Sequence, residues 1–272
     1  MASHDWVGRK KIVITGSREK VSRPPGAEWW AERLGAEVVP RGRRTLAEVA
    51  EEHGAWGVLV LQAQRVVFYV PSEGLEYFYH PGMARRRIRA ILAGQGDPMV
   101  TAMGLQPGDR LLDCTLGRAT DAIVGAFVVG PSGRVVGVES VPVVAALTAH
   151  GLGSFDSGHE RVNEAMRRVE VVCADNAEYL ANVAPGAFDV IYFDPVFHQP
   201  VEKSSAMVPL RALADRRPLT AEVIELALTK AGRVVVIKQR KGTPLWQKVR
   251  PARVVGGRHA TVEYGVFLPA AD

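Results

Sequence analysis

The second half of the chain alternates short apolar runs with helix-like segments, and no other feature constrains the fold as strongly. Strand-like runs occur at 110–117, 133–140, 169–176 and 188–195, separated by segments with helical periodicity. Strands that alternate with helices in this way form βαβ units, in which helices cover both faces of a parallel sheet. We therefore expect an α/β fold with a doubly wound, mostly parallel sheet.

Both ends of the chain extend this scheme. Residues 220–232 predict a helix and 233–238 a strand, and two runs on either side of Gly256 predict that the sheet ends in an antiparallel hairpin. Before the alternation begins, a strand, two helices and a hairpin indicate a small N-terminal α/β domain. The predicted organisation is a small domain over 1–75, a basic connector over 76–108 and a larger domain over 109–272.

The composition limits the classes of protein to which the chain can belong. Of the 272 residues, 47% are hydrophobic and 23% are charged, which is enough apolar material for a packed core. The net charge of +5 suits a polyanionic partner such as nucleic acid, although ordinary solubility charge explains it equally well. Cys114 and Cys173 lack the spacing of a zinc site, and no apolar run reaches the roughly 18 residues that cross a bilayer. We expect a cytoplasmic protein without a metal or a membrane partner; the oligomeric state stays open.

Polar side chains stand where each strand of the larger domain ends. In an open parallel sheet, ligands bind outside the carboxyl ends of the strands. Stability alone would accept any polar residue at these positions, so the recurrence of carboxylates favours a ligand site. The candidates are Asp113, Thr115 and Gly117, then Glu139 and Ser140, then Asp175 and Asn176, and finally Asp194.

The first three strand ends suit an adenosine-containing ligand. Glu139 lies 22 positions after Gly117, at the end of the next strand, where a carboxylate can accept both hydroxyls of a ribose. This arrangement fits NAD and S-adenosylmethionine alike. Asp175 and Asn176 can reach the adenine edge, or they can simply cap the following helix. The Gly-x-Gly-x-x-Gly fingerprint of dinucleotide sites is absent after Gly117.

Four motifs carry a family resemblance: LLDCTLGRATDA, GVESVPVVAALTAHGL, YFDPVF with the downstream KSSAMV, and RVVVIK. Residues 111–246 resemble class I S-adenosylmethionine-dependent methyltransferases, and more closely the RsmJ family, which methylates guanine N2 in small-subunit ribosomal RNA. HPGMARRR at 80–87 also resembles the connector of that family. The resemblance implies a Rossmann-like sheet, S-adenosylmethionine as cofactor, and ribosomal RNA or the small ribosomal subunit as partner. It also implies cofactor contacts by Thr120 and Asp121, although Ala119-Thr120 replaces the family's usual second glycine and arginine.

The sequence Asp-Pro-x-Phe at 194–197 resembles the Asn/Asp-Pro-Pro-Tyr/Phe motif of amino methyltransferases. By that resemblance the carboxylate of Asp194, which also lies near the cofactor, and the carbonyl of Pro195 accept hydrogen bonds from the amine and orient its lone pair. Phe197 stacks on the base, which is worth about 1 to 3 kcal/mol for a base on an aromatic ring. A base inside a helix is out of reach, so the nucleotide is splayed out or flipped.

Basic and histidine side chains are the candidates for contact with the RNA. A run of arginines at 85–87 and 89 lies on a predicted helix, which contacts phosphates or is simply a solvated face. Lys238 ends a strand, where a phosphate-contacting or snorkelling lysine is favoured over a catalytic one. His198 either acts in catalysis or touches the substrate as a loop residue. The assigned substrate-binding residues are His80, Arg85, Arg86, His198, Lys203 and Lys238.

Other functions remain open at this stage. The same cofactor could serve a protein side-chain amide or a small molecule, because Asp-Pro-x-Phe implies only a planar nitrogen acceptor. An NAD-type dehydrogenase or a non-catalytic nucleotide-binding domain is disfavoured by the missing glycine fingerprint and by the motif at 194–197.

Overall fold

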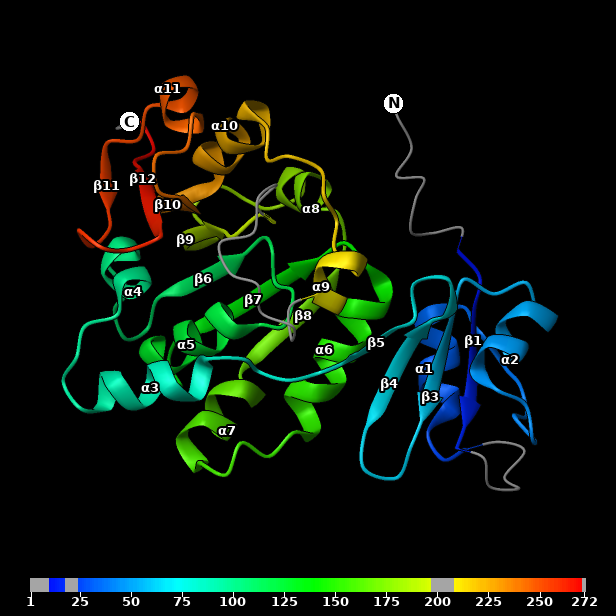
Figure 1. Cartoon of the computed structure of the whole chain (residues 1–272). Coiled ribbons are helices and arrows are strands. Elements are labelled where there is room, and N and C mark those ends of the chain that lie inside the picture. The colour runs from blue at the N-terminus through cyan, green and yellow to red at the C-terminus, as the bar shows by residue number, and fades with distance from the viewer. Residues whose placement is uncertain (1–9, 18–23, 197–207, 271–272) are drawn as a thin grey trace.

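The computed structural model describes residues 10–17, 24–196 and 208–270, with side chains from 210 onward in the last segment. These residues form two β-sheets with helices around them (Figure 1). The larger sheet has the strand order β11-β12-β10-β9-β6-β7-β8. Its strands are β6 (Arg110–Asp113), β7 (Arg134–Glu139), β8 (Val169–Cys173), β9 (Phe188–Phe193), β10 (Ala231–Arg240), β11 (Arg253–Val255) and β12 (Val262–Phe267).

The larger sheet has the predicted topology. Strands β6 to β10 run parallel, whereas β12 runs antiparallel to both β10 and β11. The chain builds outward from β6 to β7 and β8 on one side, and from β9 to β10 on the other. The order therefore reverses between β6 and β9, which is where open α/β sheets bind ligands. The prediction of a doubly wound sheet that ends in an antiparallel hairpin is confirmed.

Helices cover both faces of this sheet because its strands alternate their apolar side chains between two cores. The helices are α3 (Ala84–Leu92), α4 (Pro98–Met103), α5 (Thr120–Val129), α6 (Pro142–Ser154), α7 (Glu160–Arg167), α8 (Asn176–Ala181), α9 (Val208–Leu213), α10 (Ala221–Lys230) and α11 (Leu245–Val249). Leu111 faces the core formed with α3, α4, α5 and α7, and Leu112 faces the core formed with α8 and α10. The sequence pattern does not predict a helix at α7, which is short and mostly polar.

The smaller sheet has the order β2-β1-β3-β4-β5. Its elements are β1 (Ile12–Gly16), α1 (Ala27–Leu34), β2 (Glu37–Val38), α2 (Leu46–Glu52), β3 (Gly57–Leu61), β4 (Val66–Val70), the 3-10 turn η1 (Pro71–Glu73) and β5 (Leu75–Phe78). Strand β5 crosses the predicted boundary at residue 75. We therefore propose that the N-terminal domain ends at Phe78.

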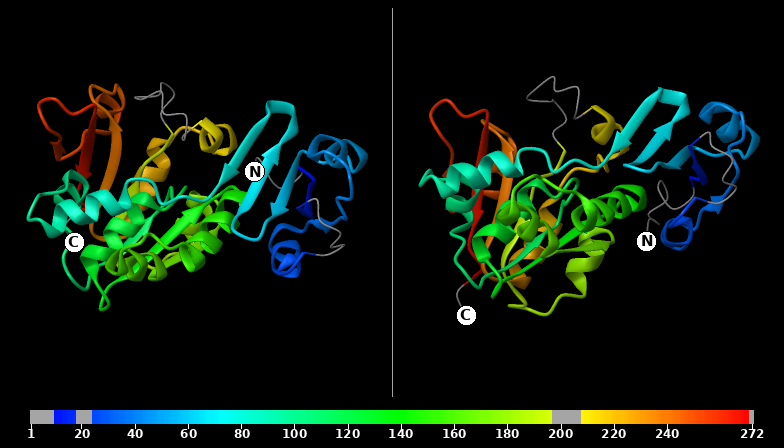
Figure 2. Two further views of the ribbon diagram at one scale, coloured as in Figure 1. Left: turned by 60° about the horizontal axis from the view of Figure 1, so that its bottom comes forward. Right: turned by 90° about the horizontal axis from the view of Figure 1, so that it is seen from below.

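The two sheets are joined by a continuous apolar contact through α6 and α9. Trp30 of α1 and Phe68 of β4 belong to the same buried cluster as Leu147 of α6 and Leu210 of α9. The ring of Trp30 lies 5.1 Å from that of His150 on α6. Figure 2 shows the smaller sheet, in blue and cyan, beside the larger one. The N-terminal domain thus packs against the domain that carries the strand-end carboxylates.

Candidate active site

The ends of β6 and β9 are tied together by Thr115. Its backbone N–H donates to Asp113 Oδ1 at 3.0 Å, and its hydroxyl Oγ1 accepts from the backbone N–H of Asp194 at 2.6 Å. Because β6 and β9 are neighbours in the sheet, these contacts fix the start of the loop after β9. The described part of this loop runs through Pro195 to Val196, which is exposed.

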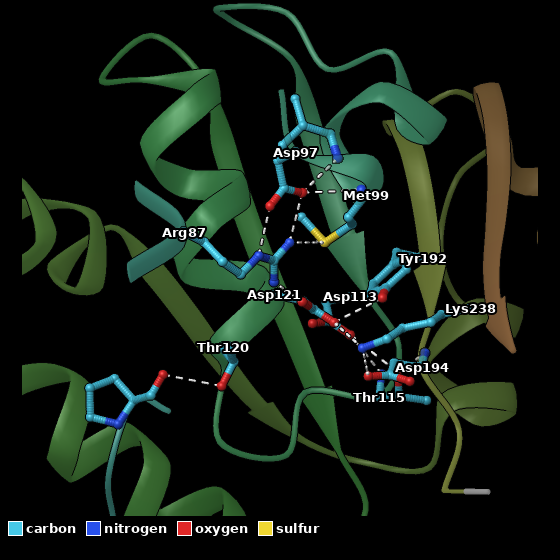
Figure 3. Close-up of polar contacts among 12 residues, drawn as sticks. Arg87, Asp97, Met99, Asp113, Thr115, Thr120, Asp121, Tyr192, Asp194 and Lys238 are labelled. Atoms are coloured by element: carbon cyan, nitrogen blue, oxygen red, sulfur yellow. Dashed lines mark hydrogen bonds and ion pairs between the residues drawn. The ribbon is translucent and has the colours of Figure 1, made fainter. Parts of the chain in front are cut away.

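Lys238 of β10 brings a positive charge to this point. Its Nζ lies 2.7 Å from Asp194 Oδ2 and 3.4 Å from Asp121 Oδ2 (Figure 3). Its side chain is 20% exposed, against 30% for Asp194 and 10% for Asp121. The role of Lys238 in binding the substrate, expected from its place at a strand end, stays a prediction. The contact with Asp194 could not be predicted, because sequence does not give the register between β9 and β10.

Asp121 lies at the centre of a buried polar network. The guanidinium of Arg87 donates to its Oδ1 and the hydroxyl of Tyr192 donates to its Oδ2, the latter at 2.8 Å. Arg87 also pairs with Asp97, with Nε 2.8 Å from Oδ2 (Figure 3). The predicted basic connector therefore reaches the strand ends through one arginine of α3. The carboxylate of Asp121 contacts two cations, Arg87 and Lys238, and its expected role as a cofactor ligand stays a prediction.

These carboxyl groups differ in their pKa values. Burial raises the pKa of Asp113 to about 8, and the neighbouring Asp121 and Asp194 add to this rise. Burial also raises the pKa of Asp121, but the charges of Lys238 and Arg87 outweigh it and leave that pKa below its usual range. For Asp194, burial and the charge of Asp121 outweigh the attraction of Lys238, and its pKa is raised to about 6. At pH 7, Asp113 is mostly protonated, whereas Asp121 and Asp194 are carboxylates.

A second group of polar contacts links the ends of β6 and β7. Gly117 has φ +51°, a conformation that glycine adopts readily, and its N–H donates to Glu139 Oε2 at 3.0 Å. Glu139 Oε1 accepts from the N–H of Val141 at 2.9 Å. Burial raises the pKa of Glu139 to about 7. Each carboxylate oxygen can accept more than one hydrogen bond, so these contacts leave acceptor capacity for ribose hydroxyls.

The end of β8 is held by residues that sequence reasoning missed. Asp175 Oδ1 accepts from the backbone of α8, so the helix-capping alternative is present in the structure. Its Oδ2 accepts from Arg217 at 2.7 Å, and Arg217 also pairs with Asp215. Asp215 in turn accepts from the hydroxyl of Ser140 at 3.2 Å. The segment before α10 thus joins the ends of β7 and β8, and no motif in the sequence signals it.

The remaining candidates occupy several places. Asn176 donates its side-chain amide to the carbonyl of Cys114 at 3.4 Å. Thr120 donates to the carbonyl of Pro81 at 3.1 Å, so its hydroxyl holds the connector. His80 Nδ1 accepts from the N–H of Gly82 at 3.0 Å. Arg85 and Arg86 are exposed on α3, and Phe197, His198 and Lys203 lie outside the described residues.

Two other features are absent from the described parts of the chain. No group of three or more His, Cys, Asp and Glu side chains there could hold a metal ion. In the same residues, no helix combines the length and apolar character needed to cross a membrane.

Comparison with known proteins gives consistent matches. Residues 66–267 match a family described as putative SAM-dependent methyltransferases. The uncharacterized protein YpiP of Bacillus subtilis is 38% identical over 256 residues, which cover 94% of this chain and 98% of that protein. Ribosomal RNA small subunit methyltransferase J of Laribacter hongkongensis is 30% identical over 231 residues, covering 80% of this chain and 76% of that enzyme. A SAM-dependent methyltransferase from Neisseria gonorrhoeae has the same fold, with a TM-score of 0.61, 16% identity and coverage of 96% and 98%.

Proposed function

We propose, from the premise that this chain belongs to the family of putative SAM-dependent methyltransferases, that it methylates the exocyclic N2 of guanine in small-subunit ribosomal RNA. S-adenosylmethionine is its cofactor. When bound, this cofactor supplies a methyl group whose carbon–sulfur bond breaks in line with the attacking nitrogen lone pair, the sulfur keeping the bonding electrons. We propose that the reaction takes place in the cytoplasm and that the small ribosomal subunit is the partner.

The residues at the ends of β6 and β7 fit this cofactor. Glu139 is partly exposed at the carboxyl end of β7 and keeps acceptor capacity for the ribose hydroxyls. The turn at Gly117 brings backbone close to the same place without a side chain in the way. We propose that Glu139 binds the ribose hydroxyls. The adenine would then bind at the end of β8, where Arg217 contacts Asp175.

The acceptor amine is assigned to Asp194, and its position carries the proposal. A guanine amine is a weak nucleophile because its lone pair is delocalised into the ring, and it gains electron density when its protons are held by acceptors. Asp194 stands at the reversal point of the sheet with its backbone fixed by Thr115 and one carboxylate oxygen fixed by Lys238. Pro195 follows, and its fixed φ reduces the ordering needed to aim its carbonyl. Asp194 can also take the proton that the methylated amine releases.

The relatives support ribosomal RNA as the substrate. Proteins named ribosomal RNA small subunit methyltransferase J align with 80% or more of this chain at about 30% identity. The net charge of +5 and the exposed arginines of α3 agree with a polyanionic substrate. A protein amide or a small molecule would use the same acceptors, and the experiment below distinguishes them from RNA.

The test is methyl transfer to small ribosomal subunits from a strain that lacks the gene. Purified protein and deuterated S-adenosylmethionine should place a labelled methyl group on one guanosine, found as N2-methylguanosine by nucleoside mass spectrometry. Subunits from the parent strain should take up little label, because their site is already methylated. No label in the RNA, from protein that binds S-adenosylhomocysteine in calorimetry, would contradict the proposed substrate.

Asp194→Asn should separate the roles of acceptor and cofactor ligand. We expect turnover to fall by about 100-fold or more, because an amide presents one oxygen instead of two and no negative charge. Affinity for S-adenosylhomocysteine should stay within about tenfold of the wild type. Asp189→Asn, which changes the same group at the other end of β9, is the control and should keep turnover within about twofold. A loss of affinity as large as the loss of turnover would make Asp194 chiefly a cofactor ligand.

A further inference from the structure

Lys238 occupies a position that is costly for a lysine. Its side chain is 20% exposed, and its ammonium group contacts two carboxylates of different elements, Asp194 after β9 and Asp121 on α5. Removing a cation from water costs free energy, and the fold gains little from such a pair compared with apolar residues of similar size. A role in function would explain why the strand places a lysine here.

We propose that Lys238 is a positioning residue for methyl transfer, which holds Asp194 through Oδ2 as an oriented carboxylate so that Oδ1 can accept from the acceptor amine. This inference rests on the proposed function and deepens it. The hydrogen bond from Lys238 goes to Oδ2 of Asp194, at 2.7 Å, so the lysine itself leaves Oδ1 to the amine.

The strand register places Lys238 where this role requires it. Strands β9 and β10 are parallel neighbours, and Phe193 pairs with Ile237, so the next residues along are Asp194 and Lys238. The sheet itself therefore sets the distance between the two charges. A lysine on a loop would lack this constraint, because its position would depend on the loop conformation.

Asp121 acts in this arrangement as the anchor of Lys238. It has two other partners, Arg87 and the hydroxyl of Tyr192, so it does not depend on Lys238 for its hydrogen bonds. In the described part of the chain, Lys238 is the one cation that contacts Asp194. The ammonium group of Lys238 contacts both carboxylates, but Asp121 has other partners and lies farther from it, at 3.4 Å against 2.7 Å for Asp194 (Figure 3).

The titratable groups around this pair set the expected pH dependence. They are Arg87 on α3, Asp113 at the end of β6, Asp121 on α5, Tyr192 on β9 and Tyr264 on β12. Tyr264 is the residue of β12 that pairs with Lys238 of β10. The tyrosines stay neutral at pH 7, because burial raises the pKa of Tyr264 to about 12 and that of Tyr192 well above its usual value. Arg87 is shared with Asp97, so loss of Lys238 leaves Asp194 beside negative charge without a cation in contact.

Lys238→Met should therefore impair turnover in a pH-dependent way. The pKa of Asp194 should rise, so that more of the carboxyl is protonated at neutral pH. We expect kcat on small subunits to fall by about 100-fold at pH 7, by more at pH 6 and by less at pH 9. Lys238→Arg, which keeps the charge, should retain kcat within about tenfold and the wild-type pH profile. Lys248→Met, an exposed lysine on α11, is the control and should match the wild type.

A second readout needs neither cofactor nor RNA. In protein labelled with ¹³Cγ-aspartate, the signal missing from Asp194→Asn identifies Asp194, and its titration should move to higher pH in Lys238→Met. If wild-type protein methylates no RNA, the proposed function fails, and this titration still decides whether Lys238 sets the state of Asp194. Lys238→Gln, which keeps a donor without the charge, carries the same test if Lys238→Met does not fold.

Three results would overturn the inference. An equal loss of kcat at every pH, with the Asp194 titration unmoved, would show a merely structural lysine. A loss of affinity for S-adenosylhomocysteine beyond tenfold would place Lys238 with the cofactor. A higher KM for RNA at unchanged kcat, with a weaker salt dependence of binding, would make it a phosphate contact.

Discussion

Three carboxyl groups at the strand ends show how burial and neighbours give one residue type different roles. Asp121 has two cations in contact and stays ionised, whereas Asp113 is 2% exposed and accepts from the backbone and hydroxyl of Thr115. Asp194 lies between these cases, with one cation and a partly exposed side chain. An acceptor for an amine must be ionised and accessible, and of the three, Asp194 meets both conditions.

The protonation of Asp113 should make folding stability depend on pH. Its pKa in the folded protein is raised to about 8, above the value of an unfolded aspartate, so folding favours the protonated form. The stabilisation is complete below the unfolded pKa of about 4 and is lost as pH rises through about 8. Urea denaturation of Asp113→Asn should therefore show a smaller loss of stability between pH 6 and 9 than the wild type. Glu225→Gln, an exposed carboxylate on α10, should leave the wild-type slope, and an equal slope in Asp113→Asn would contradict a buried acid.

Neighbouring arginines on α3 should differ sharply in their contribution to stability. Arg87 pairs with Asp97 and Asp121, so Arg87→Ala removes the cation from Asp97 and leaves Asp121 with Lys238 alone. We expect a loss of about 2 to 4 kcal/mol, below the value for a fully buried pair because the Arg87 side chain is 21% exposed. Arg86→Ala, at an exposed position, should change stability by less than about 0.5 kcal/mol. Urea denaturation of both variants checks this, and similar losses would mean that the network around Asp121 contributes little.

At the scale of elements, α6 needs a glycine where it packs against the segment that links the two domains. The ring of Tyr79, directly after β5, packs against Gly151, where an added Cβ would lie 2.0 Å from the ring. Gly151→Ala should therefore destabilise the protein by about 1 to 3 kcal/mol, although alanine is normally the better helix former. Gly153→Ala on the same helix meets nothing within 4 Å and should stabilise it by about 0.5 to 1 kcal/mol. Thermal unfolding of the pair gives the comparison, and two shifts of the same sign would show that the ring moves aside.

The elements of the larger domain could be predicted because each apolar run has one clear period. Strands β6 to β9 and the closing hairpin lie where the sequence places them. Helix α7 was missed because only Val162, Ala165 and Met166 are buried in a short polar segment. The pairs Lys238–Asp194 and Arg217–Asp175 join residues 44 and 42 positions apart, and only the packed structure sets such contacts. Sequence thus gives the residues at the strand ends, but not which of them already have partners.

For the whole molecule, the shared core between the domains should make unfolding a single event. Leu147 on α6 is 1% exposed and lies in one cluster with Trp30 and Phe68 of the N-terminal domain. Leu147→Ala should cost about 2 to 4 kcal/mol, while Leu268→Ala, at a side chain that is 62% exposed, should cost less than about 0.5.

Two probes can follow the domains separately in this experiment. Tryptophan fluorescence reports mainly on the N-terminal domain through Trp29, Trp30 and Trp56, and loss of S-adenosylhomocysteine binding reports on the larger domain. Because the cluster around Leu147 spans both domains, the two curves should keep a common midpoint in urea and shift together in Leu147→Ala. If fluorescence changed first while binding persisted, the N-terminal domain would unfold independently of the domain that carries the site.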